Sequence, residues 1–466
     1  MRAFLTFVLV LAVASVTAQT TYLTFYDALS LGLERNPAVT ASEYAVRAAH
    51  RERQATIGLF MPRVSVRGAY AHLNKDVDID VNHLKGNLSA LLTPLLPPIE
   101  GALSPVLAMD LSYTLQRKNS AFLGGDVVLP LFTGGKILTA NKVAKIEEQR
   151  ALDRSRAVNG ALLVEIVERY FGVELARRVV AIRREAITVV EHHLRDIALL
   201  EREGMAVESE RLYAEYRLAE AESDLRHAEL ELSTAQRALQ TSLASEGEGD
   251  IHPTTPLFLP LRIEPLDYFQ SMASLHNPQL SEVGHLRELA RMNMRMERAN
   301  LMPEVVAMGG MVFCDHQLSA LVPRMAVGVG LNFRIFDGLR SEFRYSAAQM
   351  QQRRVEALEV KAQRDVTLLI ESLYNNLQKA IASLPSERRS EAFAEEYFRA
   401  QSAAFREGIA TSADVVDAAL NLSRVRLSRI QRAFEMDLAL ARLLDASGLA
   451  DRFVQYIGSG NSESLY

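Results

Sequence analysis

A duplication is the feature of this sequence that most constrains its fold. Asn36-Pro37 recurs as Asn277-Pro278, and Pro62 recurs as Pro303; both separations, 277 − 36 and 303 − 62, equal 241 residues. A sequence that repeats itself over such a distance predicts two copies of one supersecondary unit. Each half therefore has to be interpreted together with the other.

The later part of each copy repeats at a shorter interval. Phe132 recurs as Phe336, and Gly204 recurs as Gly408; 336 − 132 and 408 − 204 both equal 204 residues. The interval therefore shortens once, by 241 − 204 = 37 residues. We expect this surplus of 37 residues to lie within about residues 74–121 of the first copy.

The first 18 residues have the pattern of a secretory signal peptide. Arg2 gives a short positive start, residues 3–13 are almost entirely apolar, and Val16-Thr17-Ala18 supplies small residues for cleavage before Gln19. The apolar run is shorter than the roughly 20 residues that a membrane-spanning helix needs. The mature chain is therefore expected to be exported.

Composition and motifs exclude several classes of function. The formal net charge of −5 gives no sign of a nucleic-acid partner. Cys314 is the sole cysteine, so an intrachain disulfide and a cysteine-based metal cluster are excluded. The sequence contains no HExxH, P-loop or GxSxG motif. We therefore expect neither an enzyme nor a bound metal or cofactor.

Each half contains two long helical patterns that are separated at a glycine, Gly204 or Gly408. The four helices are expected over about residues 136–203, 208–243, 339–407 and 413–444. At 1.5 Å per residue, the first would extend roughly 100 Å, which no compact domain needs. Pro385 is expected to kink or interrupt the third. Asn36 and Asn277 are expected to cap the shorter helices that open the two halves.

Segments in which apolar and small or polar residues alternate predict four β-strands, two in each half. They are expected over about residues 63–73, 123–131, 304–314 and 323–336. In the last of these, Val327 and Val329 face one way, and Gly328 and Asn332 face the other. Such a strand suits a position between lipid and a wet lumen, although a half-buried soluble sheet alternates in the same way. The export signal and the long helices favour the membrane.

Four strands cannot close a barrel. Because an open sheet edge is not tolerated in hydrocarbon, other chains must complete the sheet. Known barrels start at about 8 strands. The sequence thus predicts an oligomer, whereas the number of chains depends on the resemblance that follows.

Six motifs, which occur in order and in duplicate after the signal peptide, resemble those of the TolC-like outer-membrane efflux proteins, or outer membrane factors. Residues 23–29, which lead to Asn36-Pro37, resemble the opening helix of that family. Residues 129–135 resemble its strand-to-helix junction, and residues 405–408 followed by 414–418 resemble its helix-hairpin tip. The resemblance covers nearly all of the mature chain.

The resemblance implies an α + β membrane protein with duplicated β-strand and long-helix repeats. Three chains would form a 12-stranded outer-membrane β-barrel, four strands per chain, continuous with a periplasmic α-helical barrel. The parts would be a signal peptide (1–18), a first repeat (19–244), an equatorial linker (245–272), a second repeat (273–447) and a C-terminal tail that is equatorial or disordered (448–466). The surplus at about 74–121 would be an extracellular loop.

The implied function is that of a passive trimeric exit duct in a tripartite efflux or type I secretion system. It would contact outer-membrane lipid, extend into the periplasm, and dock to a periplasmic adaptor (membrane fusion protein) and an inner-membrane pump. Two other classes stay open. A periplasmic adaptor also uses helical hairpins, but one hairpin between small β-domains is expected there. A structural coiled coil of the cell envelope needs sustained heptads without strands or glycine breaks.

Asp414 and Asp417 are predicted to form a lumenal acidic constriction. In the family, carboxylates six and nine residues after the tip glycine line the narrowest point of the lumen, and both equivalent positions here are Asp. Residues three apart share one helix face, so three chains would bring six carboxylates around one axis and attract cations. The alternative is that both are ordinary exposed acids near a helix N-terminus. Glu210 and Tyr213 occupy the equivalent positions of the first copy.

The resemblance places Gly204 and Gly408 at the two periplasmic tip turns, where glycine permits the backbone to reverse. Together with Phe405 they are expected to contact the adaptor. The best-known family members close the tip with a latch that uses an arginine and a tyrosine. Ala410 and Phe405 stand at those positions here, so the family's mode of gating does not carry over.

Overall fold

A computed structural model describes residues 21–80, 82, 85, 109–110, 112–245, 249–260, 262–319, 321–458 and 462–464. The expected signal peptide lies outside the described residues, as does most of the surplus segment. The chain divides into two compact units. The sheet unit contains His50–Ile146 and Glu288–Arg353; the helical unit contains Glu147–Arg287 together with the chain up to Ala49 and from Arg354 onward.

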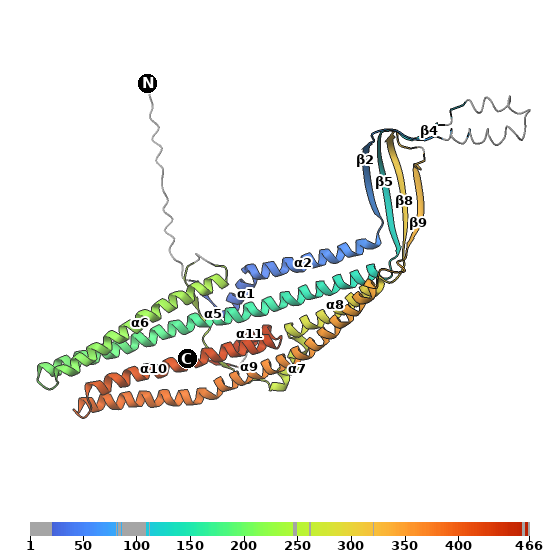
Figure 1. Ribbon diagram of the computed structural model, residues 1–466. Helices are drawn as coiled ribbons and strands as arrows, with labels where there is room; N and C mark the ends of the chain where they lie inside the picture. Colours follow the sequence, from blue (N-terminus) through green and yellow to red (C-terminus); the bar gives the residue numbers. More distant parts are fainter. Residues whose placement is uncertain are drawn as a thin grey trace, which may run out of the picture. The chain divides into compact units, whose positions relative to one another are not determined.

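The sheet unit is built on a four-stranded antiparallel sheet in the order β2-β5-β8-β9 (Figure 1). Its strands are β2 (Arg63–His72), β5 (Asn119–Phe132), β8 (Glu304–His316) and β9 (Met325–Asn332). β2 and β5 belong to the first copy, β8 and β9 belong to the second, and the β5–β8 pairing joins the two copies. The four predicted strands are therefore confirmed.

The last strand is shorter than predicted. It was expected to continue to Phe336, but β9 ends at Asn332, which pairs with Glu304 at the start of β8. Pro303 precedes Glu304 and has no backbone N–H to donate, so the ladder cannot extend further. A similar cause acts on β5, where the register shifts between Pro130 and Phe132.

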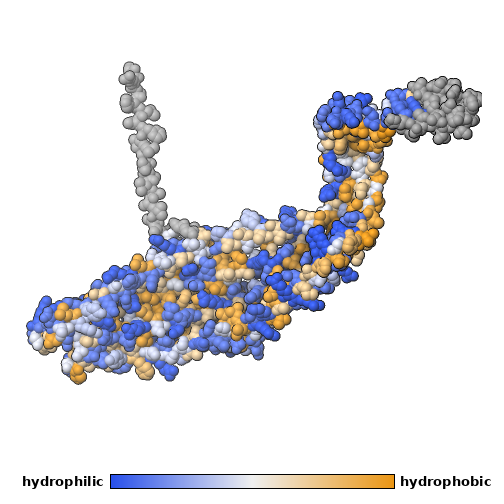
Figure 2. All heavy atoms as spheres, viewed as in Figure 1, coloured by the Kyte–Doolittle hydropathy of each residue, from blue (hydrophilic) through white to orange (hydrophobic). Residues whose placement is uncertain are grey.

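One face of the sheet is apolar. Val64, Val127, Gly309 and Val327 are paired directly across the four strands and therefore share a face. Large side chains on this face are between 40 and 77% exposed: Val64, Val66, Tyr70, Leu123, Val127, Met311, Met325, Val327, Val329 and Leu331. Figure 2 shows hydrophobic residues over these strands. The predicted alternation is present in the structure.

The opposite face of the sheet carries the charged residues and most of the glycines, together with apolar side chains such as Val128, Val306 and Met308. Arg67 and Asp126 form an ion pair on it at 2.9 Å. Glu304 lies on the same face of β8, where it forms an ion pair with Lys136. Glycines 124, 310, 328 and 330 alternate with the apolar residues of their strands and lie on this face as well.

Part of the surplus segment forms a ladder of its own. β3 (Val77–Asp80) pairs antiparallel with β4 (Ser112–Gln116). The sequence pattern predicts a loop here and misses this ladder. Strands as short as β3 and β4 have too few alternating positions to be recognised from the sequence.

Helices make up most of the other described residues. They are α1 (Phe25–Arg35), α2 (Pro37–Ile57), α5 (Lys136–Arg202), α6 (Glu208–Ser242), α7 (Leu266–His276), α8 (Pro278–Ala299), α9 (Arg340–Arg406), α10 (Ser412–Ala446) and α11 (Phe453–Gly458). The ends of the four longest lie within two residues of those predicted. None of the helices in the described ranges is both long and apolar enough to cross a bilayer.

Of the two outcomes expected at Pro385, a kink or an interruption, the interruption is absent. α9 is a single helix of 67 residues that contains Pro385. Proline removes one intrahelical hydrogen bond, but Leu377 and Leu384 just before it are buried in the main core. We infer that packing of this helix face compensates for the lost bond.

In each copy, one asparagine links the start of a helix near the beginning of the repeat to the end of the repeat's last helix by hydrogen bonds. The Oδ1 atoms of Asn36 and Asn277 accept backbone N–H bonds from the first turn of α2 and α8, at 2.8 and 3.0 Å. Their Nδ2 atoms donate to the carbonyl oxygens of Ser242 and Ala446, the last residues of α6 and α10, at 3.0 and 2.7 Å. The predicted capping role is confirmed, and the second bond explains why an amide occupies this position in both copies.

The main core gathers segments from the two ends of the chain. β1 (Thr21–Leu23) pairs with β6 (Ile251–Pro253), and β7 (Phe258–Pro260) pairs with β10 (Ser462–Ser464). The fully buried Tyr170 donates its hydroxyl to the carbonyl of Leu23 at 2.7 Å. The hydroxyl oxygen of Tyr170 in turn accepts the N–H groups of Thr254 and Thr255 at 3.0 and 2.9 Å. The segment between the two copies therefore packs with the N-terminal strand, and it pairs with the tail.

α6 and α10 end in the same turn but with different residues. The residue after each C-cap has a positive φ, 49° at Ala244 and 71° at Gly448. The next N–H then donates to the carbonyl five residues earlier, at 3.0 and 2.7 Å. This is a Schellman motif, for which glycine is the usual residue. The first copy therefore carries strain that the second copy avoids.

Exchanging the two residues should change stability in opposite directions. Ala244→Gly should raise the free energy of unfolding by about 1 kcal/mol, because glycine adopts the left-handed conformation without cost. Gly448→Ala should lower it by more, since the added Cβ would lie 2.5 Å from the carbonyl oxygen of His276. Thermal unfolding of the purified protein in detergent measures both effects. Shifts of the same sign in the two variants would contradict this explanation.

Candidate functional site

The two long hairpins turn at Gly204 and Gly408, as predicted. Their φ angles are 72° and 70°. The N–H groups of Met205 and Ile409 donate to carbonyl oxygens five residues earlier, at 2.8 and 2.9 Å. A Cβ at either glycine would meet nothing within 4 Å. Glycine is therefore required by the backbone conformation and not by a close neighbour.

The side chains that follow these glycines are exposed. In a Schellman motif this residue often packs back against the helix, but Met205 and Ile409 are 70 and 81% exposed. Val207 beside them is 60% exposed. Sequence reasoning did not single out these three residues, although the 204-residue interval already marks Met205 and Ile409 as equivalent apolar positions.

A small apolar core, here called the tip cluster, joins the two hairpins. Its buried members are Val190 and Ile197 from α5, Ala214 from α6 and Val416 from α10. Phe405 from α9 packs against it and is half-buried. The adaptor contact predicted for Phe405 stays a prediction, and the structure adds an inward contact for the same ring.

His193 is the polar residue beside the tip cluster. It is 7% exposed, and its ring lies edge-on to that of Phe405 with 4.6 Å between the centroids. Its Nε2 atom lies 3.1 Å from the hydroxyl of Ser412 at the start of α10. Burial lowers the pKa of His193, partly offset by the nearby charge of Asp196. His193 is therefore neutral at pH 7.

Asp414 caps α10. Its backbone N–H donates to the hydroxyl oxygen of Thr411 at 3.3 Å. The carboxylate accepts the backbone N–H and the hydroxyl of Thr411 at 2.9 and 2.6 Å. These hydrogen bonds lower the pKa of the exposed Asp414 carboxyl, which is therefore ionised at neutral pH. Asp414 thus has a structural role in a capping box, and its charge still faces solvent.

Asp417 contacts the first copy. The hydroxyl of Tyr213 lies 3.0 Å from both carboxylate oxygens of Asp417. Nη2 of Arg217 lies 3.1 Å from Oδ1 of the same carboxylate. Burial and the bond to Asp417 raise the pKa of Tyr213, so the phenol is protonated and donates. The carboxylate is still 52% exposed.

The two predicted carboxylates therefore have different surroundings. In the described part of the chain, Asp414 is hydrogen-bonded within its own helix terminus, whereas Asp417 is held by the neighbouring hairpin. Sequence reasoning identified Tyr213 as the equivalent of Asp417 but did not predict that the two would touch, and it missed Arg217. The sequence gives only a weak indication of this contact. Arg217 lies four residues after Tyr213 and therefore shares its helix face.

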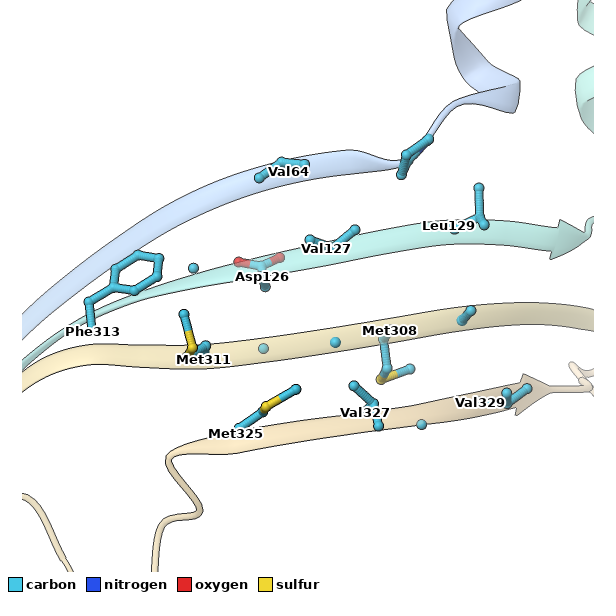
Figure 3. Close-up of a pocket in the computed structure, with 16 residues that line it drawn as sticks. Val64, Asp126, Val127, Leu129, Met308, Met311, Phe313, Met325, Val327 and Val329 are labelled. Carbon is cyan, nitrogen blue, oxygen red and sulfur yellow. The ribbon is translucent and has the colours of Figure 1, made fainter.

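The sheet carries a second candidate site. An open groove of about 800 Å³ lies over the strands, with Val64, Val127, Leu129, Val327 and Val329 along it (Figure 3). Asp126 is the one ionisable residue of its lining. Because Arg67 already pairs with Asp126, the groove offers little to orient a polar ligand. We interpret it as part of the apolar face.

Metal binding finds no support in the described ranges. Nowhere in them do three or more His, Cys, Asp or Glu side chains gather in a way that could hold a metal ion.

Known proteins resemble the chain in sequence over residues 270–449 and in fold over nearly all of its length. Residues 270–449 match the family model of outer membrane efflux proteins. No curated protein matches the chain by sequence. Among solved structures it is similar to CusC, with a TM-score of 0.73, 15% identity, and coverage of 92% of this chain and 93% of that one.

Two further solved structures give the same result. The chain is similar to the CmeC outer membrane channel of Campylobacter jejuni, with a TM-score of 0.72, 11% identity, and coverage of 91% of this chain and 86% of that one. It is also similar to the MtrE outer membrane channel of Neisseria gonorrhoeae, with a TM-score of 0.70, 14% identity, and coverage of 91 and 89%.

The fold defines the class of protein, in which a four-stranded sheet and two long helical hairpins are built by duplication. Over residues 270–449 the chain matches the model of the outer membrane efflux protein family, and the likeness in fold to solved structures extends through the first copy. The resemblance inferred from the sequence is therefore confirmed.

Acid should loosen the tip cluster through His193. The pKa of His193 is below its ordinary value of 6.5 in the folded protein, so the unfolded state binds more protons as the pH falls below 6.5. The contribution of neutral His193 to stability is therefore present above this pH and declines below it. Hydrogen exchange of the segment from Phe405 to Ser412, corrected for intrinsic rates, should be faster at about pH 5.5 than at about pH 7.5.

His193→Gln is the matched control for this prediction. Glutamine can still hydrogen-bond to Ser412 but does not titrate, so the pH dependence of exchange should disappear. If the corrected exchange rate in the unsubstituted protein does not change with pH, His193 does not control the stability of the tip cluster.

Proposed function

We propose that this protein is the outer-membrane channel of a tripartite efflux or type I secretion system. It is a passive trimeric exit duct that extends into the periplasm and docks to a periplasmic adaptor and an inner-membrane pump. One observation carries the proposal. Within the described residues, the four-stranded sheet exposes an apolar face, and the outer side of each edge strand has no partner strand.

The unpaired edges argue for partners of the same kind. In the described part of the chain, β2 pairs with β5 alone and β9 pairs with β8 alone. In hydrocarbon, each unsatisfied backbone group costs several kcal/mol, so a spanning sheet has to close. The edge β2 of one chain and the edge β9 of the next can supply the missing ladder. Three chains with four strands each give the 12 strands of the proposed barrel.

The two faces of the sheet suit opposite solvents. The face with Val64, Val127 and Val327 suits lipid, because its large apolar side chains are exposed and no other described segment covers them. The face with Arg67, Asp126 and Glu304 suits a watery lumen. A soluble half-buried sheet would instead cover its apolar face with its own helices.

The hairpin turns suit docking to another protein. Met205, Val207 and Ile409 expose apolar side chains at the two turns. Exposed apolar groups of this kind commonly mark interaction sites. We propose that they belong to the contact with the periplasmic adaptor, together with Gly204, Gly408 and Phe405.

The acidic residues suit a cation-selective constriction. Asp414 and Asp417 begin α10 on one helix face, and both are exposed. We place them at the narrow end of the duct, where three chains contribute six carboxylates. The surplus segment, with its β3–β4 ladder, is proposed to be extracellular. The duct performs no chemistry on its cargo, so we propose no enzymatic activity and no cofactor.

Removing both carboxylates should reduce cation selectivity. With Asp414→Ala and Asp417→Ala combined, the reversal potential measured in planar bilayers across a potassium chloride gradient should move towards zero, because the fixed negative charge of the constriction is lost. An unchanged reversal potential would remove the constriction from the proposal. A purified, correctly folded protein that forms no pores at all would contradict the channel itself.

Asp27→Ala is the matched control for this measurement. Asp27 also caps a helix, because its carboxylate accepts the hydroxyl of Thr24 at 2.7 Å, and its backbone N–H donates to the same oxygen at 3.2 Å. It lies far from α10 in sequence and is not placed in the constriction. The variant should lose a similar capping interaction and keep the reversal potential of the unsubstituted protein.

A further inference from the structure

We propose that Arg217 sets the ion selectivity of the duct by neutralising Asp417, while Tyr213 positions the Asp417 carboxylate. This inference depends on the proposed function, since it names residues that determine the charge of the proposed constriction. The six carboxylates of the proposed constriction are then not equivalent. The three Asp417 carboxylates each face Arg217 from the first copy of the repeat, whereas the three Asp414 carboxylates do not.

The geometry joins the two hairpins through one carboxylate. Arg217 and Tyr213 lie on α6, Asp417 lies on α10, and the two helices are neighbours. Nη2 of Arg217 is 3.1 Å from Oδ1 of Asp417, and its Nη1 is 2.6 Å from Oε2 of Glu220. The guanidinium therefore lies between an acid of its own helix and the acid of the facing helix.

The arginine is held more firmly than a surface residue would be. Its side chain is 20% exposed, whereas that of Asp417 is 52% exposed. Its Nε atom is buried and has no hydrogen-bond partner. Partial burial reduces the screening of the pair by salt.

Tyr213 orients the carboxylate of Asp417 but carries no charge itself. Its hydroxyl is 3.0 Å from each oxygen of Asp417, so it holds the carboxylate group in the orientation that Arg217 meets. A raised pKa keeps this phenol in the protonated, donating form. Tyr213 is thus a positioning residue for Asp417, and the charge of the site is determined by Arg217, Glu220, Asp414 and Asp417.

The charge balance makes the inference testable. Asp414, Asp417 and Glu220 contribute three negative charges in each chain, and Arg217 contributes one positive charge. Replacing Arg217 by a neutral residue therefore makes the constriction more negative by one charge per chain, and replacing Asp417 makes it less negative by one. Replacing both restores the original balance. A purely structural role of Arg217 would not produce this cancellation.

Reversal potentials in planar bilayers across a potassium chloride gradient provide the measurement. Arg217→Gln should raise the ratio of cation to anion permeability by at least about twofold, the effect of one unit charge at roughly 10 Å in water. Asp417→Asn should lower the ratio. The double variant Arg217→Gln with Asp417→Asn should return to the ratio of the unsubstituted protein.

Two conservative variants separate charge from packing. Arg217→Lys keeps the positive charge and should leave the ratio near its original value. Tyr213→Phe removes only the hydroxyl and should change the ratio less than Arg217→Gln does. Unfolding temperatures of all variants, measured in the same detergent, identify any general loss of structure.

The failure of this inference differs from the failure of the proposed function. If Arg217→Gln leaves the ratio unchanged while loss of Asp414 and Asp417 alters it, Arg217 does not act on the constriction and the inference is wrong. If the double variant resembles Arg217→Gln alone, Arg217 does not act through Asp417, which also overturns it. If the unsubstituted protein forms no pores, the proposed function and this inference fall together.

Discussion

The need to satisfy every backbone N–H and C=O group in hydrocarbon is the constraint on which the rest of this structure depends. A sheet with an apolar face and free edges at β2 and β9 is stable in a bilayer only when another chain pairs with those edges. In the proposed barrel, association of the chains is therefore a condition for folding. It also explains why large side chains such as Val327, 77% exposed, can remain uncovered within one chain.

The two copies of the repeat share their main structural contacts but differ at the hairpin tips. Asn36 and Asn277 make the same two hydrogen bonds in both halves, because each repeat has to fasten its start to its end. At the hairpin tips the copies differ. Tyr213 of the first copy and Asp417 of the second occupy equivalent positions and bind each other. A pair of identical residues could not provide a donor and an acceptor so simply.

Much of the fold follows from local patterns in the sequence. Periods of 3.6 and 2 located the long helices and the four strands, because side-chain burial follows these periods directly. The predictions failed where a distant partner decides the outcome. β9 ends at Asn332 because Pro303, which precedes β8, cannot donate a backbone hydrogen bond, and α9 continues through Pro385 with buried leucines on the preceding turns.

The candidate site was predicted in part. The turn glycines were found because the 204-residue interval and the left-handed backbone both point to them. The exposed acids were found by resemblance. The contact of Asp417 with Arg217, and the burial of His193 beside Phe405, depend on how α5, α6, α9 and α10 face one another. Helix periodicity fixes which residues share a face but not which faces meet.

The most direct test of the central claim is the mass of the mature protein extracted in detergent from the outer-membrane fraction, measured by light scattering with the detergent contribution subtracted. The account predicts a stable trimer, because three chains are needed to pair all strand edges. A monomer that stays soluble without detergent would contradict it, since such a chain has no shared barrel.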